Sequence, residues 1–249
     1  MHTPKRLKAI ACEILHREAC FCAAKSKNII DIQFVTKGIH DLGGAKMLER
    51  LQQEVNAVDC EKYDAIVLVY ALCNNGVAGL RAPNIPLVIT RAHDCITLLL
   101  GSDAKYREFF DRRPGTYFES TGWIERNSTN LEFVSGDIRS QLGYSHTYED
   151  YVKQYGEENA KFIMETLGNF TRNYDCYAYI DMGIQESLGY DESIKSEAAE
   201  KGWKFERLAG DLRLIQRLFD CEWDESEFLV VPPHKSIAPA YDGSIVRCE

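Results

Sequence analysis

Four side chains that can bind a metal ion stand at or just after short apolar runs of the sequence. They comprise three thiols and one imidazole, namely Cys12, Cys73, His93 and Cys95. Thiolate sulfur and imidazole nitrogen are donors that suit Zn²⁺. His93 and Cys95 are separated by one residue, so both can reach one point from a loop. We expect these four residues to form a zinc site, with Cys12 as the fourth ligand or Glu13 in its place.

Further polar residues lie close to the predicted ligands along the chain. We expect three carboxylates to act as acid–base or supporting groups, namely Glu13, Asp94 and Glu119. A second set could hold an anionic cofactor or substrate through backbone amides or a guanidinium, namely Asn74, Gly76 and Arg91. The loop that contains Gly76 has neither the G-x-G-x-x-G pattern nor the P-loop lysine, which disfavours a nucleotide site.

Alternating strand-like and helix-like segments must position these side chains. Continuous apolar runs rich in β-branched residues at 65–71 and 87–90 are typical of strands covered on both faces. Apolar residues at helical spacing predict helices over 45–58 and 211–219. Further strands are expected at 7–12, 29–36, 176–182, 203–208 and 228–231, and further helices at 15–24, 148–167 and 191–201.

This alternation predicts an α/β fold with a mostly parallel sheet and helices on both faces. We expect a single domain over residues 1–249, with a variant in which two Rossmann-like lobes, 1–113 and 146–249, are joined by an irregular middle segment. Ligands bind beyond the carboxyl ends of the strands in such sheets. The predicted zinc ligands all occupy such ends.

Composition excludes several functional classes. The 249 residues include 29 Lys and Arg against 38 Asp and Glu, which gives a net charge of −9. That average field would repel a phosphate backbone, so we expect no nucleic-acid partner. No apolar run is long enough to cross a membrane, and the N-terminus lacks the pattern of a signal peptide. We therefore expect a cytoplasmic protein without a membrane partner.

Nine cysteines are a high number for a chain of this length. In a reducing compartment they indicate free thiols and a metal or reactive-thiol site rather than disulfides. Burial as a small apolar residue is the ordinary role of any one cysteine. The remaining six receive no role from the sequence, namely Cys20, Cys22, Cys60, Cys176, Cys221 and Cys248.

Several segments together resemble an uncharacterised family, domain of unknown function 1638, known from methanogenic archaea and anaerobic bacteria. The resemblance extends from about Lys8 to Asp242. Two positions depart from it, since His234 and Cys221 stand where glycine is expected. The segments that carry it are ACEIL (11–15), YALCNNG (70–76), RAHDCITLLLGS (91–102), PGTYFESTGWI (114–124), GWKFE (202–206), GDLRL (210–214), EW (222–223) and FLVVPP (228–233).

The resemblance implies a setting in anaerobic metabolism beside corrinoid-dependent methyl transfer. In that setting the element from His93 to Cys95 is similar to the zinc motif of cobalamin:thiol methyltransferases, although those enzymes are larger (β/α)₈ barrels. There, zinc deprotonates a thiol that attacks a methyl group. The implied activity is thiol activation or methyl transfer, with a small-molecule thiol substrate and a corrinoid protein or methyltransferase as partner.

Two alternatives stay open. The chain could instead be a non-catalytic accessory protein that binds a ligand or cofactor in the same cleft. It could also be a redox protein with an iron–sulfur cluster held by Cys12, Cys73 and Cys95.

Overall fold

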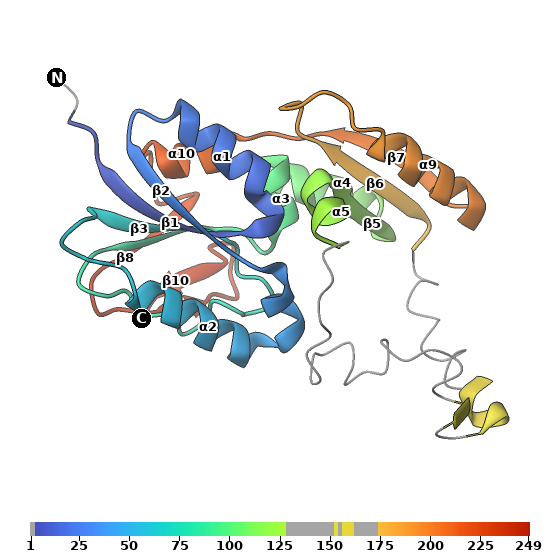
Figure 1. Cartoon of the computed structure of the whole chain (residues 1–249), viewed down its shortest axis with the longest axis horizontal. Coiled ribbons are helices and arrows are strands. Elements are labelled where there is room, and N and C mark those ends of the chain that lie inside the picture. The colour runs from blue at the N-terminus through green and yellow to red at the C-terminus, as the bar shows by residue number, and fades with distance from the viewer. Residues whose placement is uncertain (1–2, 128–151, 154–155, 162–173) are drawn as a thin grey trace.

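The computed structural model describes residues 3–127, 152–153, 156–161 and 174–249 (Figure 1). These residues form an α/β fold with a mostly parallel five-stranded sheet and a second, parallel sheet of three strands. The expected fold class is thus confirmed. Most of the helix expected at 148–167 lies outside the described residues.

The five-stranded sheet has the order β2-β1-β3-β4-β8, in which only β8 is antiparallel to its neighbour. All residues of β3 and β4 are buried, as the continuous apolar runs predict. The strands are β1 (Arg6–Cys12), β2 (Ile29–Val35), β3 (Ala65–Val69), β4 (Leu87–Thr90) and β8 (Phe228–Val231).

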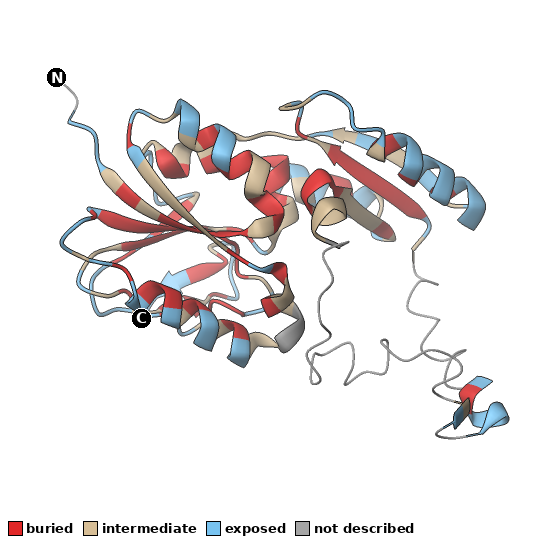
Figure 2. Ribbon diagram, in the orientation of Figure 1, coloured by how far each residue is buried: buried red, intermediate tan, exposed pale blue. Residues whose placement is uncertain are grey.

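Helices cover both faces of this sheet (Figure 1). On one face lie α1 (His16–Lys25) and α10 (Arg213–Phe219), and α2 (Gly44–Asn56) lies on the other. Figure 2 shows that the buried residues gather where the helices meet the sheet. The chain leaves β1 for β2 on one side and then passes back beyond β1 to β3. The topological switch point, where open α/β sheets bind ligands, therefore lies between the carboxyl ends of β1 and β3.

The second sheet has the order β5-β6-β7, with strands β5 (Thr116–Ser120), β6 (Cys176–Asp181) and β7 (Lys204–Ala209). Helix α9 (Tyr190–Lys201) packs against β6 and β7, and α4 (Asp103–Arg112) packs through Phe109 against Phe118 of β5. A small hairpin of β9 (Ile237–Pro239) and β10 (Val246–Cys248) ends the chain. The two lobes expected from the sequence stay a prediction.

The two sheets meet at the carboxyl end of β1. There the short helix η1 (Glu13–Leu15) contacts α5 (Thr121–Asn127), which directly follows β5. Gly122 packs so closely that a Cβ atom would lie 1.7 Å from the carbonyl oxygen of Ile14. Arg17 of α1 also forms a bidentate pair with Glu125 of α5, at N···O distances of 2.6 and 3.0 Å. Helix α5, which follows the first strand of the second sheet, therefore lies next to the switch point.

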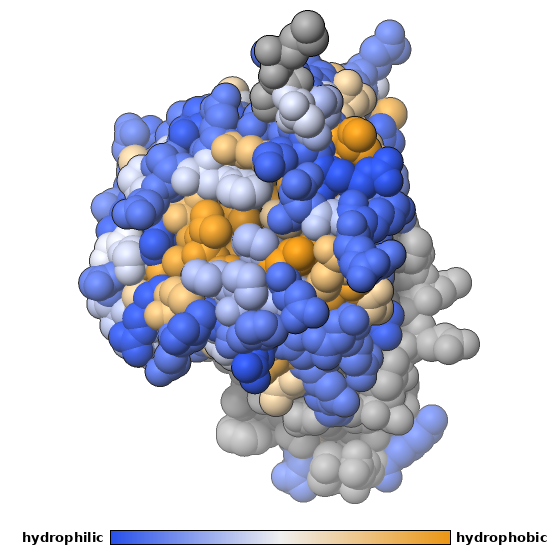
Figure 3. Space-filling model, turned by 90° about the vertical axis from the view of Figure 1, so that its left-hand side faces the viewer, coloured by the Kyte–Doolittle hydropathy of each residue, from blue (hydrophilic) through white to orange (hydrophobic). Residues whose placement is uncertain are grey.

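None of the helices in the described part of the chain is long and apolar enough to cross a membrane. On the end of the molecule opposite the second sheet, apolar residues gather within a hydrophilic rim (Figure 3). Apolar atoms are normal on folded surfaces.

Candidate functional site

Three thiols from three strand ends lie together at the switch point. Cys12 is the last residue of β1 and is 2% exposed, while Cys73 and Cys95 follow β3 and β4 and are half-buried. The amide of Cys73 donates to the carbonyl of His93 at 2.9 Å, and Leu72 donates likewise to Ala92. These bonds continue the pairing of β3 and β4 beyond the strands and hold the two loops side by side.

The turn that carries Cys73 has an unusual backbone. Cys73, Asn74 and Asn75 have φ angles of 47°, 53° and 64°, in the left-handed region that residues with a Cβ rarely adopt. Packing against α2 holds the turn, because a Cβ on Gly76 would lie 2.2 Å from the sulfur of Met47. Such strained residues concentrate at functional sites.

His40 is a site residue that the sequence reasoning missed. It belongs to η2 (Lys37–Leu42), which follows β2. Its Nε2 lies 3.6 Å from the Sγ of Cys12, and its ring stacks on Tyr70 with centroids 6.0 Å apart. Its place just beyond the predicted strand 29–36 was the available signal, since this too is a carboxyl strand end.

Glu13 fixes the loop on which His40 stands. Its Oε1 accepts from the amide of Lys37 at 2.7 Å and from the hydroxyl of Thr36 at 2.8 Å. The residue after β1 thus anchors the segment after β2. In this structure Glu13 positions η2 and, through it, His40.

The three thiols are neutral and close to one another. Burial raises the pKa of Cys12 and of Cys73 to about 12 and that of Cys95 well above its usual range. The charge of Cys12 further raises the pKa values of Cys73 and Cys95. Cys12 therefore lies close enough to both other thiols for its charge to act on them.

Helix α5 and η2 supply further walls of the site. The side chain of Trp123 interacts with Cys95 and lowers its pKa, against the larger effect of burial. The ammonium group of Lys37, a residue only 6% exposed, lies 5.1 Å from the centre of the Trp123 ring. Its positive charge lowers the pKa of Cys12, again against a larger effect of burial. A cation and an indole therefore border the thiols.

The structure places His93 and Asp94 differently from the thiols. The side chain of His93 is exposed, and the residue meets Cys73 through its backbone carbonyl. Asp94 caps α3 (Cys95–Leu100), because its Oδ1 accepts from the amide of Thr97 at 3.1 Å. The carboxylate of Asp94 thus has a structural role at a helix N-terminus.

The expected anion-binding residues do not converge. The guanidinium of Arg91 donates to backbone carbonyls of the C-terminal segment, those of Glu225, Phe228, Ser244 and Val246. Arg91 thereby holds this segment against the first sheet. The side chain of Asn74 is exposed, and the amide of Gly76 donates to the carbonyl of Cys73 at 3.0 Å.

Glu119 lies on β5 of the second sheet. Burial raises its pKa to about 7, and the charge of Glu197 raises it further, while Lys37 and Lys201 lower it. Its Oε2 is buried and has no hydrogen-bond partner in the described part of the structure. The charges that act on Glu119 therefore come from α9 and η2 rather than from the cysteines.

The thiols and the His40 imidazole at the switch point do not form a complete metal site. Within the described residues, no group of three or more His, Cys, Asp and Glu side chains is already arranged to hold a metal ion. The donor set at the switch point is nevertheless chemically suited to a thiophilic metal, with three thiols and the imidazole of His40.

Comparison with known proteins gives one match. No curated protein and no solved structure matches the chain significantly. The sequence profile of a family described as "Protein of unknown function (DUF1638)" matches residues 34–219. This range covers most of the chain and includes His40, Cys73 and Cys95, while Cys12 precedes it. The chain therefore belongs to the DUF1638 family of proteins of unknown function.

Proposed function

We propose that this protein binds Zn²⁺, or a related thiophilic metal ion, at the switch point and acts there on a small-molecule thiol. The proposed donors are three cysteines and a histidine, namely Cys12, Cys73, Cys95 and His40. His40 takes the place that the sequence suggested for His93, because the His40 ring faces Cys12 whereas the His93 side chain is exposed.

The distance between the Cys12 sulfur and the His40 ring nitrogen is the main support for this proposal. Sulfur and nitrogen bonded to a tetrahedral Zn²⁺, at about 2.3 Å and about 2.0–2.1 Å, lie about 3.6 Å apart. The Sγ of Cys12 and the Nε2 of His40 are separated by 3.6 Å. Two of the four donors thus already have the separation of ligands on one zinc ion.

The remaining two donors stand on two neighbouring loops. Cys73 and Cys95 stand on loops that are hydrogen-bonded to each other, and the charge of Cys73 raises the pKa of Cys95. We expect a change of side-chain rotamer to bring these two sulfurs to the Cys12–His40 pair when the ion binds.

Charge balance also supports a metal at this position. Three thiolates around one Zn²⁺ leave a net charge of −1, which is costly to bury without a compensating cation. The buried ammonium of Lys37 lies close enough to act on Cys12. Lys37 therefore offsets the charge of the loaded site.

A zinc ion lowers the pKa of a coordinated thiol so that the thiolate exists at neutral pH. Catalytic zinc sites keep one position open, so three of the four donors would hold the ion during catalysis and a substrate thiol would occupy the place of the fourth. Methyl transfer in anaerobic, corrinoid-linked metabolism is the proposed context, with a corrinoid protein or methyltransferase as partner. This part rests on the family resemblance, and a non-catalytic accessory role is its alternative.

Elemental analysis of the full-length protein, purified without oxygen, tests the metal. We expect about one equivalent of zinc in the wild type and a loss of it in the double variant Cys73→Ala/Cys95→Ala. The double variant Cys22→Ala/Cys176→Ala removes two buried thiols elsewhere and should keep the metal. Metal far below one equivalent in the wild type would remove the proposal, and brown, iron-containing protein would indicate an iron–sulfur cluster instead.

A matched pair of histidine variants tests the ligand set. His40→Ala should weaken zinc binding by at least tenfold in a chelator competition, because it removes a ligand. His93→Ala should leave the affinity unchanged. The reverse result would restore His93 as the ligand and contradict the role of His40.

A further inference from the structure

A groove lies between the last turns of α2 and two segments that pack beside it, the chain between β3 and β4 and the turn after β8. Its volume is about 460 Å³, within the range of pockets that hold small molecules. Its lining includes Gln52, Asn56, Gly79, Arg81 and His234. A second hollow of about 420 Å³ shares the first three of these residues and continues along α2.

Arg81 is held firmly at this groove although it is exposed. Its amide donates to the Oε1 of Gln52 at 2.8 Å, and its carbonyl accepts from the Nε2 of Gln52 at 3.1 Å. On its other side an isolated β-bridge pairs it with Ser236. The Nε of Arg81 donates to the carbonyl of His234 at 3.0 Å. These bonds fix the backbone and the inner nitrogen of the guanidinium and leave the two Nη groups available.

The charge of Arg81 has no ion-pair partner among the described residues. This is so although Asp and Glu outnumber Lys and Arg in the sequence, 38 to 29. Arg213 and Arg217, by contrast, both pair with Glu227. The two Nη groups of a guanidinium donate in parallel to two oxygens of a carboxylate or a phosphate. Because the side chain is already held in place, binding such a group costs less conformational entropy than at a freely moving arginine.

Asn56 and His234 add to the lining of the groove beside Arg81. The Oδ1 of Asn56 accepts from the Nε2 of Gln52 at 2.9 Å, which leaves the Nδ2 group of Asn56 as a donor. His234 has a φ angle of 67°, in the left-handed region, and its amide donates to the carbonyl of Ala82 at 3.0 Å. Strained residues of this kind concentrate at functional sites. The turn at His234 therefore supplies both the carbonyl that holds Arg81 and a residue that lines the groove.

We propose that this groove binds a small molecule through a carboxylate or phosphate group, which Arg81 holds with its two Nη groups while Asn56 donates from Nδ2. The groove is larger than one such group, so the rest of the molecule extends along α2 into the second hollow. Glu49 lines that second hollow, and the negative charge of the ligand therefore belongs at the Arg81 end.

This site is separate from the thiols and goes beyond the proposed function. Met47 packs on the turn that carries Cys73, whereas Asn56 lies in the groove. The two residues are nine positions apart on α2, which is about 14 Å along a helix. Binding of an anion in the groove therefore needs no metal at the switch point.

NMR titrations of the full-length protein test the groove, with inorganic phosphate in one arm, acetate in the other, and ionic strength held constant with chloride. We expect saturable shifts of the Gly79 amide and of the Asn56 side-chain amide. Arg81→Gln should weaken this binding about tenfold, because it removes the guanidinium and retains the backbone bonds to Gln52. Arg247→Gln removes an exposed arginine on β10 and should bind as the wild type does.

The tighter of the two anions identifies the group as phosphate or carboxylate. No saturable shift in either arm would overturn the inference, and so would equal binding by the wild type and Arg81→Gln. Asn56→Asp decides if Arg81→Gln does not fold, because it keeps an acceptor for Gln52 and adds a negative charge that should repel the anion. Unchanged binding in Asn56→Asp would then contradict the site. The presence or absence of zinc at the thiols affects none of these outcomes.

Discussion

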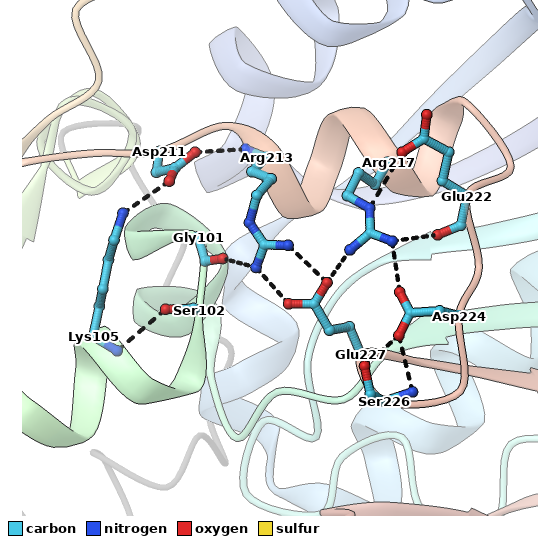
Figure 4. A network of polar contacts seen from close by, with 10 residues as sticks. All are labelled: Gly101, Ser102, Lys105, Asp211, Arg213, Arg217, Glu222, Asp224, Ser226 and Glu227. Atoms are coloured by element: carbon cyan, nitrogen blue, oxygen red, sulfur yellow. Dashed lines mark hydrogen bonds and ion pairs between the residues drawn. The ribbon is translucent and has the colours of Figure 1, made fainter.

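Two polar regions of the molecule differ in how completely their groups are paired. The first joins α10 to the segment before β8 (Figure 4). There Glu227 accepts from both Arg213 and Arg217, and Arg217 also donates to Asp224 at 2.6 Å. Arg213 donates in addition to the carbonyl of Gly101 at 2.8 Å. Each charge in this network meets an opposite charge or a carbonyl.

The thiol site at the switch point is the opposite case. Its cysteines are neutral, the hydroxyl of Tyr70 has no hydrogen-bond partner in the described residues, and the backbone at Cys73 is left-handed. A saturated network contributes to the stability of the fold and has no capacity left for a ligand. An incomplete set of polar groups gains its partners when a ligand binds. The incomplete pairing of its polar groups therefore favours the thiol site as the place where a ligand binds.

The largest expected effect is stabilisation by zinc. At a free concentration about a thousand times the dissociation constant, zinc should raise the free energy of unfolding by about 4 kcal/mol. Cys73→Ser should abolish this gain while changing the stability of the metal-free protein little. Urea unfolding with and without zinc measures both. An equal gain in the variant would show that zinc binds elsewhere.

A change in the network of Arg213, Arg217 and Glu227 should lower the stability of the protein and leave zinc binding unchanged. Glu227→Gln removes the charge shared by two guanidinium groups and should cost about 2 kcal/mol of stability, a value reduced by their partial exposure. Zinc affinity should remain that of the wild type. Glu200→Gln on the exposed side of α9 is the control for the loss of a carboxylate. A changed zinc affinity in Glu227→Gln would mean that the two regions are coupled.

Glu18 is an exception to this comparison, because one oxygen of its buried carboxyl group has no hydrogen-bond partner among the described residues, although Glu18 is not a proposed ligand. It is 1% exposed, and burial raises its pKa from 4.5 to about 7. A raised carboxyl pKa contributes stability that is complete below about pH 4.5 and is lost as the pH rises through 7. Glu18→Gln should therefore stabilise the protein by about 2 kcal/mol at pH 8 and by little at pH 4.5.

Urea unfolding at both pH values measures this effect. A gain that is the same at pH 4.5 and pH 8 would contradict the titration of Glu18 as its cause. Glu200→Gln again serves as the control, since that carboxylate is exposed.

The smallest expected effect is the loss of stability when the Asp94 cap is removed, and it tests whether the role of Asp94 is structural. Asp94→Ala removes the cap of α3 and should cost about 1 kcal/mol. Asp94→Asn retains a capping oxygen and should recover most of that stability. Both variants should bind zinc as the wild type does. A loss of turnover or metal in Asp94→Asn, with stability intact, would instead assign the carboxylate to the chemistry.

The sequence by itself determined the strands and the thiols that follow them. Continuous apolar runs rich in β-branched residues are typical of covered strands, so β3 and β4 and the loops that follow them could be predicted from local pattern. Parallel strands bring their carboxyl ends to one edge, which is why Cys12, Cys73 and Cys95 are neighbours. The positions of these three cysteines can therefore be predicted without knowing where their side chains point.

Only the tertiary structure decided which histidine joins the thiols. His93 stands one residue from Asp94, whose capping of α3 fixes the loop while the imidazole remains exposed. His40 stands far from the cysteines in sequence and reaches Cys12 because Glu13 anchors η2 and Tyr70 stacks on its ring. Sequence spacing gives the distance along the chain, but a ring is oriented by hydrogen bonds and packing from other elements. These contacts form only when β1, β2 and β3 come together in the sheet.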